Sequence, residues 1–308
     1  MTNQIAQGII AAMVTPLNDD STINENELRN QVDRQINAGV NGVFTLGTNG
    51  EGYILNHDEK LNVIKIVVDQ VARRVPVYAG TGCVSTQETI QLSKEAEEIG
   101  VDALSVITPS FAKASQEELY RHYEALNEAV NLPILLYNIP ARTGNALEPQ
   151  TVSRLANLKH IVGVKDSSGN FDNILQYIEL TRDRDFKVIS GNDALILWTL
   201  QAGGSGGITA IANVLPTVMV SIYKRWLKGD FKGARAAQDS IRPLRNCFKY
   251  GNPNTITKVA TNMIGCPVGE TRAPFNYLSE EGRSQLKATL HEYYSDFFVK
   301  PESVIRDE

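Results

Sequence analysis

Short apolar runs alternate with longer amphipathic runs along most of this 308-residue chain. The short runs have the length of buried strands, whereas in the longer runs apolar residues recur every three to four positions, as on one face of a helix. The expected strands are Gly8–Val14, Gly42–Leu46, Val75–Ala79, Ala103–Ile107, Pro133–Tyr137, Ile161–Lys165, Lys187–Ser190 and Gly206–Thr209. The expected helices are Asn24–Ala38, Asp58–Val71, Thr86–Ile99, Gln116–Val130, Gln150–Leu158, Phe171–Leu180 and Ala194–Ala202.

Repeated alternation of strand and helix predicts an α/β fold, and eight such units predict a (β/α)8 TIM barrel. A doubly wound sheet would have fewer strands and usually a glycine fingerprint after the first one. Beyond Pro216 the pattern is helical through Tyr294. We therefore expect a catalytic barrel over residues 1–225 and a helical region packed on it over residues 226–308, with a polar tail at 300–308.

Composition and charge exclude several classes of protein. The chain is 42% apolar and 21% charged, as in ordinary globular proteins. Its net charge of -5, without a basic stripe, argues against a nucleic-acid partner. Its three cysteines form no close pair and its four histidines have no metal-ligand spacing, so neither a disulfide framework nor a metal site is expected. No basic leader precedes an apolar segment and no apolar run could span a membrane, so we expect a cytoplasmic protein.

Polar residues gather where the expected strands end, which is where TIM barrels build their active sites. The second strand leads into Gly47–Gly52 and the fifth into Tyr137–Pro140. The sixth leads into Lys165–Gly169 and the seventh into Ser190–Asp193. These four strand ends are the candidate site.

Lys165 and Tyr137 are the residues with the clearest chemistry. Lys165 follows an apolar strand, and an apolar site favours the free amine that attacks a carbonyl. The alternative is a rim lysine that pairs with Asp166 in water. Tyr137 could act as an acid–base phenol, or it could simply pack with its hydroxyl satisfied.

The loop GTNGEG, residues 47–52, has the glycines of a tight turn whose consecutive N–H groups suit a carboxylate or phosphate. It is not a Walker loop, because no Gly-Lys-Ser/Thr follows it. Gly203–Gly207 lacks the context of a dinucleotide fingerprint, so we expect close backbone packing there. Arg142 could bind a substrate carboxylate through two hydrogen bonds or could brace its own loop.

Four motifs in this order, GTNGEG, YNIPARTG, GVKDSSGN and SGND, resemble the dihydrodipicolinate synthase and N-acetylneuraminate lyase family of pyruvate-dependent lyases. The resemblance extends to Ala12–Pro16, to Leu55–Glu59 and to the segment Asn252–Asn254 that leads to Lys258. It thus covers nearly the whole chain.

The resemblance implies a barrel that usually forms a homotetramer and uses neither a metal nor an organic cofactor. Lys165 would form a Schiff base with pyruvate or another 2-oxo acid. Tyr137 would shuttle protons, and the Thr48 hydroxyl would hydrogen-bond to it. N–H groups of the loop at Gly47 to Asn49 would receive the carboxylate. The substrate-binding residues that the resemblance implies are Gly47, Asn49, Arg142, Gly191, Ile208 and Phe111.

The motifs contain features of more than one branch of the family. Arg142 is similar to the arginine that binds the carboxylate of aspartate semialdehyde in synthases. However, Asn49 stands where synthases usually have a second threonine, and Ser110-Phe111 stands where they have a tyrosine pair. The second of those tyrosines completes a proton relay across a subunit interface, and a phenyl ring cannot pass a proton.

The expected function is therefore a Schiff-base lyase or aldolase that makes or breaks a C–C bond between pyruvate and an aldehyde, similar to dihydrodipicolinate synthase. One alternative is an aldolase or dehydratase of the same family that acts on a 2-keto-3-deoxy sugar acid or a 4-hydroxy-2-oxo acid, or an N-acetylneuraminate lyase. Another is a sensor that binds an anionic metabolite without catalysis. Lys165, Tyr137 and Thr48 together argue against the sensor, because a binder has no use for a buried amine beside a phenol.

Overall fold

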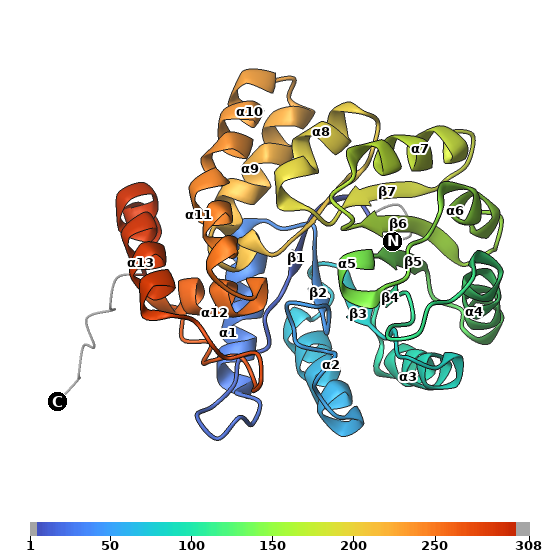
Figure 1. Cartoon of the computed structure of the whole chain (residues 1–308), viewed down its shortest axis with the longest axis horizontal. Helices are drawn as coiled ribbons and strands as arrows, with labels where there is room; N and C mark the ends of the chain where they lie inside the picture. Colours follow the sequence, from blue (N-terminus) through green and yellow to red (C-terminus); the bar gives the residue numbers. More distant parts are fainter. Residues whose placement is uncertain (1–4, 300–308) are drawn as a thin grey trace.

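Eight strands close into a barrel in the computed structural model, which describes residues 5–299 (Figure 1). Each strand runs parallel to both neighbours, and the eighth pairs back with the first. The predicted TIM barrel is confirmed. The strands are β1 (Gly8–Ala12), β2 (Gly42–Thr45), β3 (Val77–Gly80), β4 (Ala103–Ile107), β5 (Ile134–Asn138), β6 (Ile161–Asp166), β7 (Lys187–Ser190) and β8 (Gly206–Thr209).

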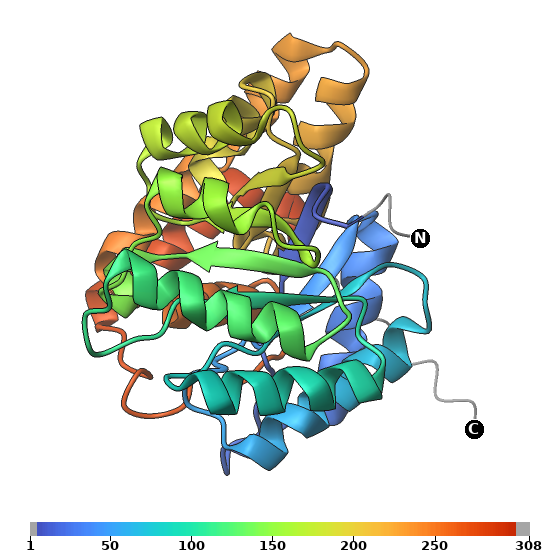
Figure 2. The same ribbon diagram turned by 90° about the vertical axis from the view of Figure 1, so that its right-hand side faces the viewer.

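Helices cover the outside of the barrel, where Figure 2 shows the teal and green ones side by side along the sheet. Asn56 and Ser115 each begin a helix with a capping box. In each, the cap side chain accepts a hydrogen bond from the backbone N–H of the glutamate three residues later, and that glutamate accepts one from the backbone N–H of the cap residue. The barrel helices are α1 (Glu25–Ala38), α2 (His57–Val71), α3 (Thr86–Ile99), α4 (Gln116–Ala129), α6 (Pro149–Leu155), α7 (Phe171–Thr181), α8 (Ile196–Gln201) and α9 (Pro216–Leu227). Short helical turns lie at the strand ends: α5 (Pro140–Thr143), η2 (Asp193–Leu195) and η3 (Ile211–Asn213).

The C-terminal region is mostly helical. The pattern predicted helix throughout this region, and one segment departs from that prediction. An irregular segment separates Met263 from Glu280. Two of its glycines, Gly265 and Gly269, have left-handed backbone, and its prolines cannot continue a helix. The helices are α10 (Phe231–Ser240), α11 (Arg242–Asn246), η4 (Cys247–Tyr250), α12 (Pro253–Met263), α13 (Glu280–Tyr294) and η5 (Ser295–Phe297).

The proposed boundary between residues 225 and 226 falls in the last turn of α9, and it stays a prediction. The predicted polar tail at 300–308 lies outside the described residues.

A register shift in the barrel wall sets the geometry of the candidate site. Ile134 pairs with Ile161, but the next residue, Leu135, pairs with Gly163. The extra residue on β6 brings Tyr137 directly opposite Lys165. Because alternate strand residues face the interior, both side chains point into the barrel at its carboxyl end.

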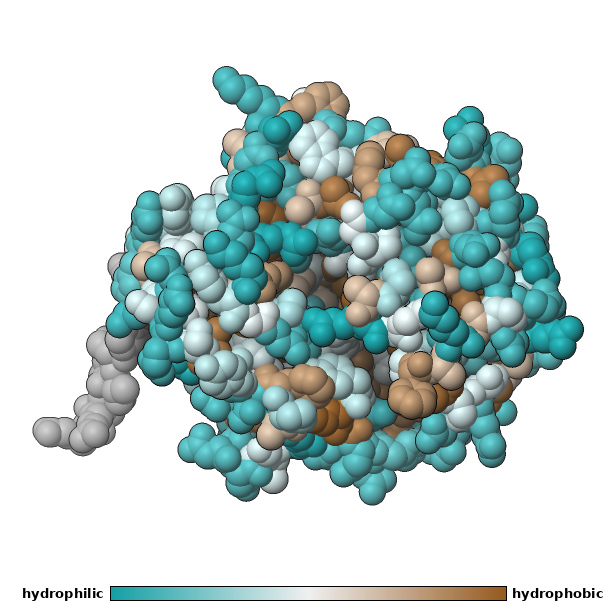
Figure 3. All heavy atoms as spheres, in the orientation of Figure 1, coloured by the Kyte–Doolittle hydropathy of each residue, from teal (hydrophilic) through white to brown (hydrophobic). Residues whose placement is uncertain are grey.

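The face seen in Figure 3 is mostly hydrophilic and is hollowed near its middle. Over residues 5–299, no helix has both the length and the apolar character needed to cross a membrane. The same residues contain no cluster of histidine, cysteine or acidic side chains that could hold a metal ion.

Candidate active site

Lys165 lies inside the barrel rather than at its rim. Its side chain is buried, with 4% of the residue exposed. The Nζ atom is 3.7 Å from the centre of the Tyr137 ring and 5.0 Å from that of Phe44. Asp166 points to the other side of β6, where it accepts hydrogen bonds from Asn138 and other neighbours. The reading of Lys165 as an exposed lysine paired with Asp166 is therefore wrong.

Tyr137 is bound as the catalytic hypothesis requires. Its hydroxyl lies 3.1 Å from Thr48 Oγ1, so the predicted contact between the two residues is present. Burial by itself would raise the pKa of the Tyr137 phenol, but the neighbouring Lys165 ammonium and the Thr48 hydroxyl outweigh burial and lower that pKa. This lowered pKa favours proton exchange between the phenol and the neighbouring amine.

The loop after β2 is held in an unusual backbone conformation. Leu46 and Glu51 both have left-handed φ angles, which side chains other than glycine rarely adopt. No residue between 5 and 299 accepts a hydrogen bond from the N–H groups of Thr48 or Asn49. These free donors fit the carboxylate-binding loop that the sequence predicts.

A cavity of about 500 Å³ opens at this end of the barrel. Gly47, Thr48, Tyr137 and Arg142 line it, together with Ser105 and Ile107 on β4. The other predicted site residues do not line the cavity. These residues are Lys165, Asn49, Gly191, Ile208 and Phe111.

Gly191 packs against the Lys165 side chain, and Ile208 lies in the barrel interior. A Cβ atom on Gly191 would come within 2.7 Å of Lys165 Cε and 2.0 Å of Ser167 Oγ, so only glycine leaves room for the lysine. Ile208 is buried among the inward-facing apolar residues. Asn49 is half-buried in the loop after β2.

Arg142 and Phe111 lie at the outer edge of the site. Arg142 is exposed, and its Nη2 atom lies 3.4 Å from Asn252 Oδ1. Phe111 is 99% exposed and has a φ of 81°. In a single chain its ring therefore lies in solvent rather than in the cavity.

Sequence reasoning missed the residues of α12 that reach the site. Asn254 donates from Nδ2 to the Thr48 carbonyl at 2.5 Å, and Lys258 pairs with Glu51. About two hundred residues separate these partners. The only signal was that both belong to the C-terminal segment that contributed to the family resemblance.

The family model described as "Dihydrodipicolinate synthetase family" matches residues 5–293. The chain belongs to this family. The chain is similar to the 4-hydroxy-tetrahydrodipicolinate synthase of Methanopyrus kandleri, with 44% identity over 92% of this chain and 95% of the relative. It is also similar to the 4-hydroxy-tetrahydrodipicolinate synthase of Syntrophus aciditrophicus, with 40% identity over 93% of this chain and 98% of the relative.

Solved structures of the family are similar to this chain over nearly its whole length. A dihydrodipicolinate synthase from Thermotoga maritima has a TM-score of 0.90 at 34% identity and covers 93% of this chain and 98% of its own. A prophage protein of the family from Escherichia coli K12, solved with pyruvate, has a TM-score of 0.91 at 33% identity and covers 94% and 99%. This chain is accordingly a lyase of the class I aldolase type, similar to dihydrodipicolinate synthase.

Proposed function

We propose that this enzyme forms a Schiff base between Lys165 and pyruvate. The enamine that forms from this Schiff base then attacks an aldehyde that carries a second carboxylate. The observation that carries the proposal is the buried Lys165 amine against the Tyr137 ring, with the Tyr137 hydroxyl bound to Thr48. This arrangement places an amine, a proton carrier and a second hydroxyl within reach of one another.

The first steps are imine formation at Lys165. Tyr137 in its deprotonated form takes a proton from the lysine ammonium, which leaves a neutral amine. The amine attacks the keto carbon of pyruvate, and Tyr137 returns the proton to the departing hydroxyl, so that water leaves and a protonated imine remains. The N–H groups of Thr48 and Asn49 hold the pyruvate carboxylate during this exchange.

The imine then makes carbon–carbon bond formation possible. Its positive nitrogen draws electrons from the neighbouring methyl group, which loses a proton and becomes an enamine. The enamine carbon attacks the aldehyde carbon, and the aldehyde oxygen takes up a proton. Hydrolysis of the new imine releases the product and restores the free lysine.

Arg142 supports an aldehyde with a distal carboxylate, such as aspartate semialdehyde. Its guanidinium reaches the cavity wall, and no carboxylate of residues 5–299 lies within ion-pair distance of it. A free guanidinium matches a carboxylate through two parallel hydrogen bonds.

One feature of the cavity favours a second candidate, an aldolase for hydroxylated 2-oxo acids. The Ser105 hydroxyl is buried in the cavity wall and has no hydrogen-bond partner among the described residues. A substrate hydroxyl at this depth would satisfy it.

A substrate panel separates the two candidates. Pyruvate consumption is measured with aspartate semialdehyde and with hydroxylated aldehydes, and pyruvate release is measured with 4-hydroxy-2-oxo and 2-keto-3-deoxy acids. Lys165→Ala is the control for each reaction. The first proposal predicts the highest kcat/KM with aspartate semialdehyde, and a strong preference for a hydroxylated substrate would replace it with the second.

We further propose that the enzyme works as a homotetramer in the cytoplasm. Phe111 is 99% exposed, and it stands where the synthases that the chain resembles have the tyrosine that completes a proton relay across a subunit interface. Cys83, Cys247 and Cys266 are all unpaired, as expected in a reducing compartment.

A further inference from the structure

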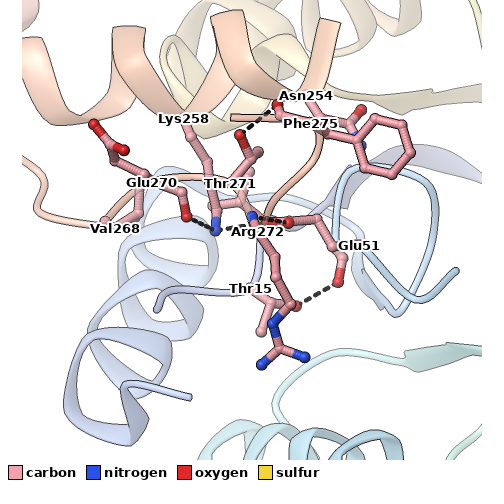
Figure 4. A network of polar contacts seen from close by, with 12 residues as sticks. Thr15, Glu51, Asn254, Lys258, Val268, Glu270, Thr271, Arg272 and Phe275 are labelled. Carbon is pink, nitrogen blue, oxygen red and sulfur yellow. Dashed lines mark hydrogen bonds and ion pairs between the residues drawn. The ribbon is translucent and has the colours of Figure 1, made fainter. Parts of the chain in front are cut away.

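A buried ion pair joins the loop that carries Thr48 to the C-terminal helix α12. Lys258 Nζ lies 2.6 Å from Glu51 Oε1, and each side chain is only 1% exposed. Lys258 also donates to the Glu270 carbonyl at 2.9 Å, and the Arg272 N–H donates to Glu51 Oε2 at 2.8 Å. Figure 4 shows the Lys258 amino group between Glu270 and Glu51, with the Arg272 backbone beside the same carboxylate.

The pair is unusual because both charges are removed from water. Burying two charges is expensive, and apolar residues of similar size often give the same or greater stability. A buried ion pair is therefore weak evidence for a purely stabilising role. Its position suggests a different role, because Glu51 lies in the same short loop as Gly47, Thr48 and Asn49.

The loop itself is held under backbone strain at both ends. Leu46 has φ 59° and Glu51 has φ 56°, and neither is glycine. Strain of this kind persists only where the surrounding contacts over-determine the conformation. Glu51 is both a strained residue and the anchor of the ion pair, so Lys258 holds the loop at one of its two strained residues.

A second contact from α12 reaches the catalytic residue directly. Asn254 lies one helical turn before Lys258, and therefore on the same face of α12. Its Nδ2 atom donates to the Thr48 carbonyl at 2.5 Å. On the barrel side, Thr15 Oγ1 donates to the Gly50 carbonyl at 2.7 Å. The loop is thus fixed at Thr48, Gly50 and Glu51, with two of these three points supplied by α12.

We infer that Lys258, Glu51 and Asn254 are positioning residues, which act on the reaction by holding the Thr48 hydroxyl against Tyr137. The inference rests on the proposed function, because Thr48 and Tyr137 act in imine formation. Loosening the loop moves Thr48 away from Tyr137 and displaces the N–H groups that bind pyruvate. A displacement of about 1 Å at a reacting group can slow a reaction by roughly 10²-fold.

The experiment measures the rate at which borohydride traps the pyruvate imine, as a function of pH. The variants are Glu51→Gln, Lys258→Met, the double variant and Asn254→Leu, which keeps the branching of the side chain at Cγ but loses the donor. Leu286→Ala is the control, because Leu286 is fully buried on α13, a helix that contacts α12, and its truncation lowers stability without changing a contact to the loop. Circular dichroism checks that every protein is folded at the assay temperature.

We expect each single variant to lower the trapping rate by about 10²-fold, with a double variant no slower than the worse single one, since the two charges act as one unit. The hydrogen bond from Thr48 is one of the contacts that lower the pKa of Tyr137, so the ascending limb of the pH profile should move to higher pH. Leu286→Ala should keep the wild-type rate and profile.

Two results would overturn the inference. The first is that the variants fold, trap the imine at rates within threefold of the wild-type rate and show an unshifted pH profile. The second is that Leu286→Ala lowers the trapping rate as much as the loop variants do. If removal of a buried charge prevents folding, Asn254→Leu decides alone by the same criteria. If wild type itself forms no trapped imine at Lys165, it is the proposed function that fails.

Discussion

Tyr137 has an acid–base role only if its hydroxyl, and not its ring, matters to the reaction. Tyr137→Phe keeps the ring beside Lys165 and removes the hydroxyl bound to Thr48. We expect kcat to fall by about 10²–10⁴-fold, as is typical when an acid–base group is lost. Tyr294→Phe is a matched control, because Tyr294 is also buried but its hydroxyl donates to the Ser240 carbonyl, among the C-terminal helices. Less than a tenfold loss in Tyr137→Phe would contradict the role.

Phe111 offers a second test at the level of a single side chain. A phenyl ring cannot relay a proton, whereas a tyrosine at this position would offer a hydroxyl. If Phe111 meets the site of a second subunit, we expect wild-type activity with aspartate semialdehyde to be present but weak, and Phe111→Tyr to raise kcat/KM. The measurement is kcat/KM of both proteins with aspartate semialdehyde and with hydroxylated 2-oxo acids. Efficient wild-type turnover with no gain from Phe111→Tyr would mean that another group completes the relay.

The side chains proposed as catalytic could be predicted from the sequence because each lies at a strand end. Lys165 and Tyr137 end apolar strands, and Thr48 follows one, so a barrel brings all three to the same end. Asn254 and Lys258 were not predictable as parts of the site from residue pattern. Their partners lie about two hundred positions away, and nothing local to α12 indicates which strand end it covers.

At the scale of elements, the order and approximate bounds of all eight strands followed from hydrophobic periodicity. The register between β5 and β6 did not, since the extra residue at Val162 depends on packing between two strands. That shift is what sets Tyr137 opposite Lys165. The irregular segment after Met263 was also missed, because long-range contacts such as Leu17 with Val268 fix it.

The packing of α3 against α4 predicts a dependence of stability on pH. His122 on α4 is buried, its Nδ1 lies 2.9 Å from Thr86 Oγ1, and burial lowers its pKa from 6.5 to about 4. Between these values the unfolded chain binds more protons than the folded one, so stability is full above pH 6.5 and falls as pH drops toward 4. The loss should reach about 3 kcal/mol at the low end of this range.

Urea unfolding of wild type and His122→Gln over this range of pH measures the effect. Glutamine has no proton to gain, so the variant should lose less stability than wild type as the pH falls. Equal losses in the two proteins would show that other groups cause the acid sensitivity.

At the scale of the whole molecule, the exposed Phe111 makes the proposed tetramer testable. Sedimentation equilibrium should give four times the 33.9 kDa mass of one chain. Phe111→Asp places a charge on the 99% exposed ring position, and it should weaken the assembly if that residue lies in an interface. A wild-type chain that sediments as a monomer, or a Phe111→Asp variant with unchanged assembly, would contradict the proposal that Phe111 lies in a tetramer interface.

The central claim is that Lys165 is the amine that binds pyruvate, and reduction by borohydride tests it most directly. Borohydride converts an imine into a stable secondary amine, so incubation with pyruvate and borohydride should add one reduced pyruvate to the chain. Digestion and mass spectrometry should locate the added mass on Lys165, and Lys165→Ala should remain unmodified. An unchanged intact mass, or an adduct on another lysine such as Lys258, would contradict the account.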